Sequence, residues 1–408
     1  MMETTPSYIS RDLYTKKLRP FIGSHIIKVL VGQRRAGKSF ILYQLIDEVL
    51  KTDPKANIIY INTELAEFKH IKTDKDLYDC VAAQLKKRRT GNYAFIDEIQ
   101  EVAFFEQAVK SLFAEGRCDI YCTGSNAHLL SGDLATYLAG RYIQFQIHPL
   151  GYREFLKFYH QKNSADALVK YLRRGGMPYL ASLPMDEHLA SEYLRNVYES
   201  ILLRDVVARE NIRNIRFLEN LVAYLADNTG NLFSANNISK YLKSQYIKIP
   251  VQTVITYLAA LEKSFFVTRV PRADVKGLKK FEIGEKYYFE DLGLRNILVK
   301  NTDFPDDRGK LCENAVYLFL AQRGYSVYVG KSGETEIDFI AEKESGRLYV
   351  QAVWKIDSKE TYQREFGNLE RIPDSFPKYV VSMDDEMPAV NFKGIRWLHL
   401  KDFLLMDI

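Results

Sequence analysis

The fold is decided by residues 32–39, which read Gly32-Gln33-Arg34-Arg35-Ala36-Gly37-Lys38-Ser39 and are followed by Phe40. They fit the pattern G-x-x-x-x-G-K-[ST] at every fixed position. An apolar run at 26–31 precedes them and a helical pattern at 39–51 follows, which is the strand-loop-helix context of a phosphate-binding loop. The alternative, a chance match in a strand-to-helix turn, leaves these flanks unexplained.

The residue types in this loop suit a bound nucleotide. Gly32 and Gly37 let the backbone turn tightly, so that successive N–H groups can point at phosphate oxygens. The start of the following helix adds the positive end of its dipole. We expect Lys38 to reach the β- and γ-phosphates and the Ser39 hydroxyl to ligate Mg²⁺. The sequence therefore predicts ATP and Mg²⁺ as ligands of residues 32–40.

A second acidic element follows the loop along the chain. Residues 93–98 read Tyr93-Ala94-Phe95-Ile96-Asp97-Glu98, a largely apolar strand that ends in two acids. This is the form of a Walker B element, in which Asp97 would hold Mg²⁺ through water and Glu98 would orient the attacking water. The alternative is an exposed pair of acids that begins a helix.

Three further polar residues are candidates for catalysis. Ser125 and Asn126 follow the strand expected at 120–123, where a small polar side chain can reach the γ-phosphate or the lytic water. Asn126 can instead cap the next helix. Arg141 precedes the strand expected at 142–147, and it can serve the γ-phosphate of a neighbouring subunit or form an internal salt bridge.

The organisation of the chain is that of two or three domains, because 408 residues with 47% hydrophobic content exceed one ordinary domain. Apolar runs at 26–31, 58–61, 93–96, 120–123 and 142–147 alternate with helical patterns, which predicts buried parallel strands in an α/β layer.

No apolar run is long enough for a membrane span and no secretory signal is visible, so we expect a cytoplasmic protein. The net charge of +5 permits nucleic-acid contact without demanding it.

The middle of the chain is predicted to hold two helices and a hairpin. Residues 234–241 and 251–262 have helical spacing, and strands at 265–270 and 286–289 flank a basic loop at 272–280. This order resembles a winged helix. A DNA-contacting surface would use side chains of the second helix and the loop, namely Gln252, Thr253, Thr256, Arg272, Lys276, Lys279 and Lys280. The alternative is a packing module between the core and the C-terminal domain.

Taken together, these features resemble the AAA-type ATPases of prokaryotes that carry an uncharacterised C-terminal domain. The resemblance runs along nearly the whole chain through short motifs: Arg11 with Tyr14, residues 32–39, 96–100, 123–126, 138–141, 149–155, 175–178, 204–205, 288–296 and 336–339. It implies an α/β P-loop NTPase core of the AAA+/ASCE type with a parallel sheet at 1–150. It further implies a helical lid and winged-helix-like region at 151–300 and a small restriction-endonuclease-like α/β domain at 301–408.

The last of these domains is expected to be catalytically inactive. Glu313 on a helix, Asp338 beside Glu336 on a strand, and Gln351 on the next strand follow the order of a metal-dependent nuclease site. Val353 stands where such a site needs lysine. Lys355 lies two residues further along, on the same strand face. It could replace that lysine only if its long side chain reached back to the site.

Three functions compete at this point. The first is an ATP-driven switch, for which DNA, a second copy of the chain and another protein are the candidate partners. The second is a metal-dependent nuclease regulated by ATP. The third is a nucleotide-binding scaffold with little turnover. Asp97 and Glu98 argue against the scaffold, and Val353 argues against the nuclease.

Overall fold

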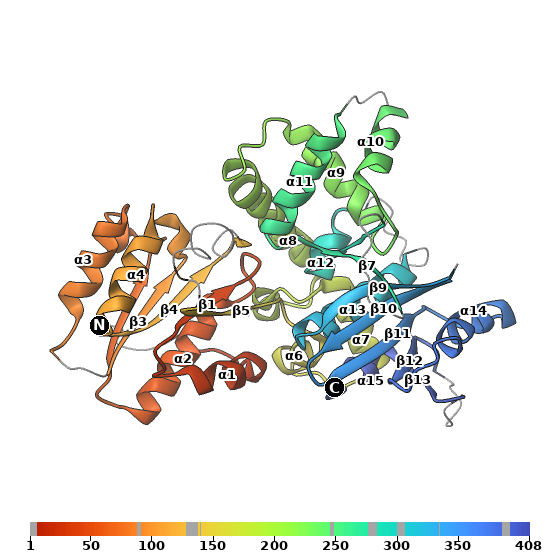
Figure 1. The fold of residues 1–408 in the computed structure, drawn as a ribbon, viewed down its shortest axis with the longest axis horizontal. Helices are drawn as coiled ribbons and strands as arrows, with labels where there is room; N and C mark the ends of the chain where they lie inside the picture. Colours follow the sequence, from red (N-terminus) through yellow and green to blue (C-terminus); the bar gives the residue numbers. More distant parts are fainter. Residues whose placement is uncertain are drawn as a thin grey trace. The chain divides into compact units, whose positions relative to one another are not determined.

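The computed structural model describes residues 6–87, 91–127, 138, 140–244, 249–275, 284–299, 307–333, 335–385 and 392–408 (Figure 1). The chain forms two compact units. The first comprises residues 1–148 and 263–265, and the second comprises residues 149–262 and 266–408. None of the helices in the described ranges combines the length and apolar character that crossing a membrane requires.

The first unit is built on a parallel sheet with the strand order β2-β3-β4-β1-β5. Its strands are β1 (Ile27–Val31), β2 (Asn57–Asn62), β3 (Asn92–Asp97), β4 (Asp119–Gly124) and β5 (Tyr142–Gln146). All five correspond to strands expected from the sequence, so the predicted α/β fold with a parallel sheet core is confirmed. Because β1, β4 and β3 run parallel, the loop after β1 and the acids at the end of β3 lie at the same edge of the sheet.

Helices cover both faces of this sheet. They are α1 (Asp12–Leu18), α2 (Lys38–Thr52), α3 (Asp74–Gln84) and α4 (Phe105–Glu115). Val29 and Val31 of β1 pack in the cluster formed with α3 and α4, whereas Leu30 packs in the cluster formed with α1 and α2. Both faces of β1 are therefore buried, which is why its sequence is a continuous apolar run except at Lys28.

The second unit begins with helices. They are α6 (Tyr152–Phe158), α7 (Ala165–Arg174), α8 (Glu187–Ser200), a π-helix (Ile201–Ala208), α9 (Ile215–Asp227), α10 (Ala235–Ser244), α11 (Val251–Lys263) and α12 (Leu292–Asn296). The helices from α8 to α11 share one apolar cluster with β6 (Val267–Val270) and β8 (Lys286–Phe289). These two strands pair antiparallel, as the predicted hairpin requires.

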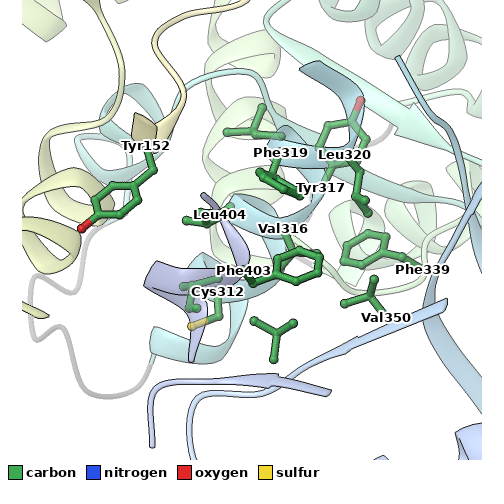
Figure 2. Packing of buried hydrophobic residues seen from close by; sticks show 14 of the residues in the cluster. Tyr152, Cys312, Val316, Tyr317, Phe319, Leu320, Phe339, Val350, Phe403 and Leu404 are labelled. Carbon is green, nitrogen blue, oxygen red and sulfur yellow. The ribbon is translucent and has the colours of Figure 1, made fainter. Parts of the chain in front are cut away.

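The C-terminal part contains a mixed six-stranded sheet with the order β13-β12-β11-β10-β9-β7. Its elements are β7 (Arg272–Asp274), α13 (Arg308–Gln322), β9 (Ser326–Ser332), β10 (Thr335–Lys343), β11 (Gly346–Ala352), α14 (Lys359–Glu370), β12 (Lys378–Ser382), β13 (Ile395–His399) and α15 (Leu400–Phe403). Figure 2 shows α13 and α15 packed on one face of this sheet together with Tyr152 of α6. The helix α14 packs on the other face.

Two expectations for this region are corrected. Residues 272–274 are not the start of a free loop, because they form β7, which pairs in parallel with β9 at the edge of the C-terminal sheet. Lys276, Lys279 and Lys280 lie outside the described residues. The strand that carries Gln351 ends at Ala352, so Lys355, expected on the same strand face, is instead exposed beyond the strand.

Candidate functional site

The loop of residues 32–37 depends on its two glycines. Gly32 has φ +150°, and a Cβ atom there would lie 2.1 Å from the carbonyl oxygen of Ile147. Gly37 has φ +94°, a left-handed conformation, and it immediately precedes α2. Since side chains at these positions would clash or strain the backbone, glycine is required where the loop passes the end of β5 and enters the helix.

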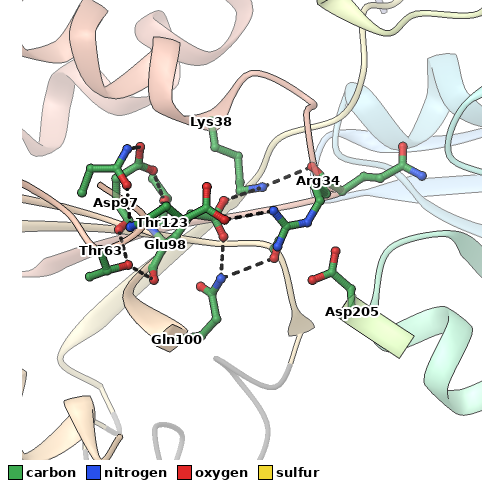
Figure 3. Close-up of polar contacts among 12 residues, drawn as sticks. Arg34, Lys38, Thr63, Asp97, Glu98, Gln100, Thr123 and Asp205 are labelled. Atoms are coloured by element: carbon green, nitrogen blue, oxygen red, sulfur yellow. Dashed lines mark hydrogen bonds and ion pairs between the residues drawn. The ribbon is translucent and has the colours of Figure 1, made fainter. Parts of the chain in front are cut away.

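Lys38 folds back over this loop. Its side chain is 3% exposed, and Nζ donates to the carbonyl oxygens of Gly32 at 3.0 Å and Gln33 at 3.2 Å. The ammonium group also lies 3.6 Å from Glu98 Oε1 (Figure 3). The lysine of the loop is thus held beside the second acid of β3, as the two motifs predict.

Asp97 ends β3 and is completely buried. Its carboxylate accepts hydrogen bonds from the hydroxyl groups of Thr123, Ser39 and Tyr60. Burial raises the pKa of Asp97, and the hydrogen bonds from Thr123 and Ser39 oppose that rise. Asp97 and Ser39, the two expected metal ligands, are therefore in direct contact.

Glu98 is held by both its backbone and its side chain. It has φ +53°, its N–H donates to Thr123 Oγ1 at 2.9 Å, and its carbonyl accepts from Thr63 Oγ1 at 2.7 Å. Gln100 Nε2 donates to Glu98 Oε2. Glu98 is only 8% exposed and Asp97 is fully buried, so the two residues are not an exposed pair of acids. The unfavourable left-handed backbone is stabilised by the threonines and turns the side chain toward Lys38.

The end of β4 supplies polar side chains to the same edge. Ser125 and Asn126 are both buried, and Ser125 Oγ accepts from Gln100 Nε2 at 3.4 Å. Thr123, two residues earlier on β4, entered the sequence analysis only as part of the motif at 123–126 and was given no role, although it contacts both Asp97 and the backbone of Glu98. The signal that could have identified it is positional, because the carboxyl ends of neighbouring parallel strands meet at one edge.

The other residues of the loop have different surroundings. Arg34 is buried and its Nη1 lies 3.1 Å from Glu64 Oε1. Gln33 is 1% exposed, and neither atom of its side-chain amide has a hydrogen-bond partner among the described residues. Arg35 is exposed with φ +65°, and Phe40 is 44% exposed. Gln33 is therefore a buried polar group whose hydrogen bonds a bound ligand could satisfy.

Arg141 lies away from this cluster. It immediately precedes β5, which runs parallel to β1, so it occupies the amino edge of the sheet while the loop occupies the carboxyl edge. Five strand residues separate the two edges by about 16 Å. The arginine is exposed, and no ion pair involves it within the described part of the chain. It is not brought to the site formed by Lys38 and Glu98.

Arg11 is a supporting residue whose role the sequence did not reveal. Its buried guanidinium donates to the carbonyl oxygens of Ala36 at 2.7 Å and His148 at 2.9 Å. The same guanidinium lies over the aromatic ring of Tyr14, 4.6 Å from its centroid. The Tyr14 hydroxyl in turn accepts a hydrogen bond from the His148 N–H at 3.0 Å. Arg11 therefore ties the phosphate-binding loop to the segment after β5. Only the motif that pairs Arg11 with Tyr14 hinted at this.

The donor groups fit the ligands that the sequence predicts. Among the described residues, no group of three or more His, Cys, Asp or Glu side chains is placed to hold a metal ion by itself. One hydroxyl, from Ser39, and one carboxylate, from Asp97, suit Mg²⁺, which keeps several waters and completes its shell with phosphate oxygens. A magnesium nucleotide is thus a better match to these residues than a free metal ion.

Comparison with known proteins places this site within a family. Residues 24–156 match the AAA domain family, and residues 165–304 match a family described as a domain of unknown function, DUF8612. An uncharacterised protein of Haemophilus influenzae is 34% identical over 407 residues, covering 97% of this chain and 98% of that protein. An uncharacterised protein of Methanocaldococcus jannaschii is 31% identical over 405 residues, covering 95% and 85%.

Solved structures that match this chain include Cdc6p of Pyrobaculum aerophilum and a RuvB mutant of Thermotoga maritima. The first is 14% identical with a TM-score of 0.31, covering 72% of this chain and 95% of that one. The second is 16% identical with a TM-score of 0.35, covering 64% and 90%. The AAA domain match spans residues 32–39, both acids of β3 and Arg141.

Proposed function

This chain carries an AAA domain and belongs to the protein family of its two full-length relatives, and we propose that it is a magnesium-dependent ATPase that acts as a nucleotide-driven switch. The observation that carries the proposal is the meeting of two motifs at one sheet edge. Lys38 Nζ lies 3.6 Å from Glu98 Oε1, and Ser39 bonds to Asp97. A scaffold that only bound nucleotide would not need the second acid at this place.

ATP binding is assigned to residues 32–40. The backbone N–H groups of the loop and the start of α2 would hold the phosphates, and Lys38 would neutralise their charge. In this structure Lys38 is shared between Glu98 and two carbonyl oxygens of its own loop. Phosphate oxygens would compete for the same ammonium group, so nucleotide binding is expected to release Glu98 from Lys38.

Hydrolysis is assigned to Glu98 as the general base for the attacking water. The second oxygen of its carboxylate is held by Gln100, which also bonds to Ser125. Ser125 and Asn126 are the proposed γ-phosphate sensors, and the contacts of Gln100 favour Ser125. Bound Mg²⁺, held by Ser39 and Asp97, would neutralise charge that develops on the phosphates.

A switch of this kind requires that ATP binding or hydrolysis change the second unit. We propose DNA as the molecule on which the switch acts. Gln252 and Thr256 are exposed on α11. Arg272 no longer supports DNA contact, because it is half-buried in β7 with Nη2 3.9 Å from Glu336 Oε2. The remaining basic residues of the proposed surface are Lys276, Lys279 and Lys280.

We also propose a homo-oligomer in which Arg141 acts on the nucleotide of a neighbouring copy. Its exposed position at the amino edge of β5 leaves no path to its own chain's loop and makes it available to another chain. Concentration-dependent turnover, lost in Arg141→Ala, would support this arrangement.

One assay separates the three candidate functions. ATP turnover is measured with and without double-stranded DNA, while the integrity of the DNA is followed in the same tubes. The proposal expects magnesium-dependent release of phosphate and intact DNA. Nucleotide binding without turnover would favour the scaffold, and turnover coupled to cleavage would favour the nuclease.

A further inference from the structure

A lysine occupies the centre of the carboxylate cluster in the C-terminal part. Lys286 of β8 places Nζ 2.8 Å from Glu313 Oε1 of α13 and 2.9 Å from Glu336 Oε1 of β10. Asp338 Oδ1, also of β10, lies 3.7 Å away. The side chain of Lys286 is 3% exposed. One ammonium group thus contacts Glu313 and Asp338, the two acids of the expected nuclease-like order, together with Glu336.

The charges in this cluster nearly cancel. Three carboxylates face the ammonium group, and the Arg272 guanidinium contributes a second positive charge near Glu336. Burial disfavours the charged form of Lys286, but Glu313, Asp338 and Glu336 outweigh burial and raise its pKa. Removing the lysine would leave three partly buried carboxylates facing one another without their central cation, which is unfavourable.

Glu313 is also covered by neighbouring residues of the same unit. The Tyr288 hydroxyl donates to Glu313 Oε1. A Cβ atom at Gly230 would lie 2.8 Å from Glu313 Oε2, so the backbone there approaches the carboxylate closely. The side chain of Glu313 is therefore only 13% exposed, whereas that of Glu336 is 32% exposed.

Gln351 is committed to a different contact. Its Oε1 accepts from the backbone N–H of Asp338 at 2.6 Å, and its Nε2 donates to Glu365 Oε2 at 2.9 Å. It braces β10 against α14 and is not turned toward Lys286. The residue expected as a metal ligand is therefore a structural link.

We propose that Lys286 is the resident cation of this carboxylate cluster, fixing the hairpin of β6 and β8 to α13 and β10 and excluding divalent metal ions. The C-terminal domain keeps the acids of a nuclease-like site and uses them to bind its own lysine. Val353 fits this assignment, since no catalytic lysine is needed on β11.

The test replaces Lys286 by methionine, which has similar length and no charge. We expect the melting temperature of Lys286→Met, measured without nucleotide, to fall by roughly 10 °C. Mn²⁺ should restore part of that loss, because the freed carboxylates can then hold a divalent ion. The wild-type protein should show a much smaller Mn²⁺ response. Both proteins carry the same phosphate-binding loop, so the difference belongs to the cluster.

Two further variants serve as controls. Lys393→Met removes an exposed partner of Glu370 and should change neither stability nor Mn²⁺ response. If Lys286→Met does not fold, the double variant Lys286→Met with Glu336→Gln restores the wild-type net charge of the cluster and should fold. An equal Mn²⁺ response in wild type and Lys286→Met would overturn the proposal. So would Mn²⁺-dependent DNA cleavage by the wild type that disappears in Asp338→Ala.

Discussion

At the scale of single residues, Glu98 is the group on which hydrolysis is proposed to depend. Glu98→Gln keeps the size of the side chain but removes the base, so ATP turnover should fall at least about a hundredfold. Nucleotide should still bind, because the loop and Lys38 are unchanged. Phosphate release at saturating ATP is the measurement, with the exposed neighbour Glu101→Gln as the matched control. Unchanged turnover in Glu98→Gln would mean that another group organises the water.

Arg11 is expected to position the loop without touching the nucleotide. Arg11→Lys replaces the two nitrogens that bond separately to Ala36 and His148 by a single ammonium nitrogen, so the link between the loop and the segment after β5 should weaken. We expect a loss of about 2 kcal/mol in stability and a weaker affinity for ATP. Fluorescent-nucleotide titration and thermal melting measure the two effects. Arg19→Lys, an exposed partner of Glu48, is the control, and equal affinity in both variants would refute the positioning role.

At the same scale, the site could be predicted only where its residues stand together in the sequence. Lys38 and Ser39 lie in one loop, and Asp97 and Glu98 close one strand, so local patterns reveal them. Arg11 acts on a carbonyl 137 positions away, at His148. Such a contact exists only after the sheet has formed, and it leaves no periodic signal in the chain.

At the scale of elements, the strands of the core were predictable because burial on both faces gives continuous apolar runs. The strands β7 and β13 were not predicted. The first has three residues and a charged sequence, and its pairing with β9 depends on a partner more than fifty positions away. The sequence pattern brought Glu313, Glu336 and Asp338 together but did not reveal Lys286 among them, since this lysine comes from β8 and the acids come from α13 and β10.

The hairpin region carries the DNA prediction. Replacing Lys276, Lys279 and Lys280 by Glu should abolish DNA binding at low salt. In the unmodified protein, affinity should fall steeply with added salt, because lysine–phosphate contacts release counterions. Fluorescence anisotropy with a duplex of mixed sequence measures both. The control replaces the exposed residues Lys51, Lys55 and Lys75 by Glu, which changes the charge equally. Equal losses of DNA affinity in both triple variants would mean that binding depends only on the net charge of the protein.

At the scale of the whole molecule, two units with separate apolar cores are joined through one chain. The first holds the proposed ATP site, and the second holds the helices, the hairpin and the C-terminal sheet. The second unit is the part proposed to respond to nucleotide, with Lys286 keeping its hairpin and sheet together. The proposed switch depends on nucleotide binding to residues 32–40.

The most direct measurement is therefore thermal melting with and without ATP and Mg²⁺, on the wild type and on Lys38→Ala. A ligand that binds only the folded state adds about 2.7 kcal/mol at a concentration one hundred times its Kd. A clear rise in melting temperature is expected for the wild type and for the control Lys51→Ala, which alters an exposed residue of the same helix. For Lys38→Ala, ATP and Mg²⁺ should cause no rise above the melting temperature that the same variant has without nucleotide. Undiminished protection of Lys38→Ala by ATP would contradict the assignment of the site.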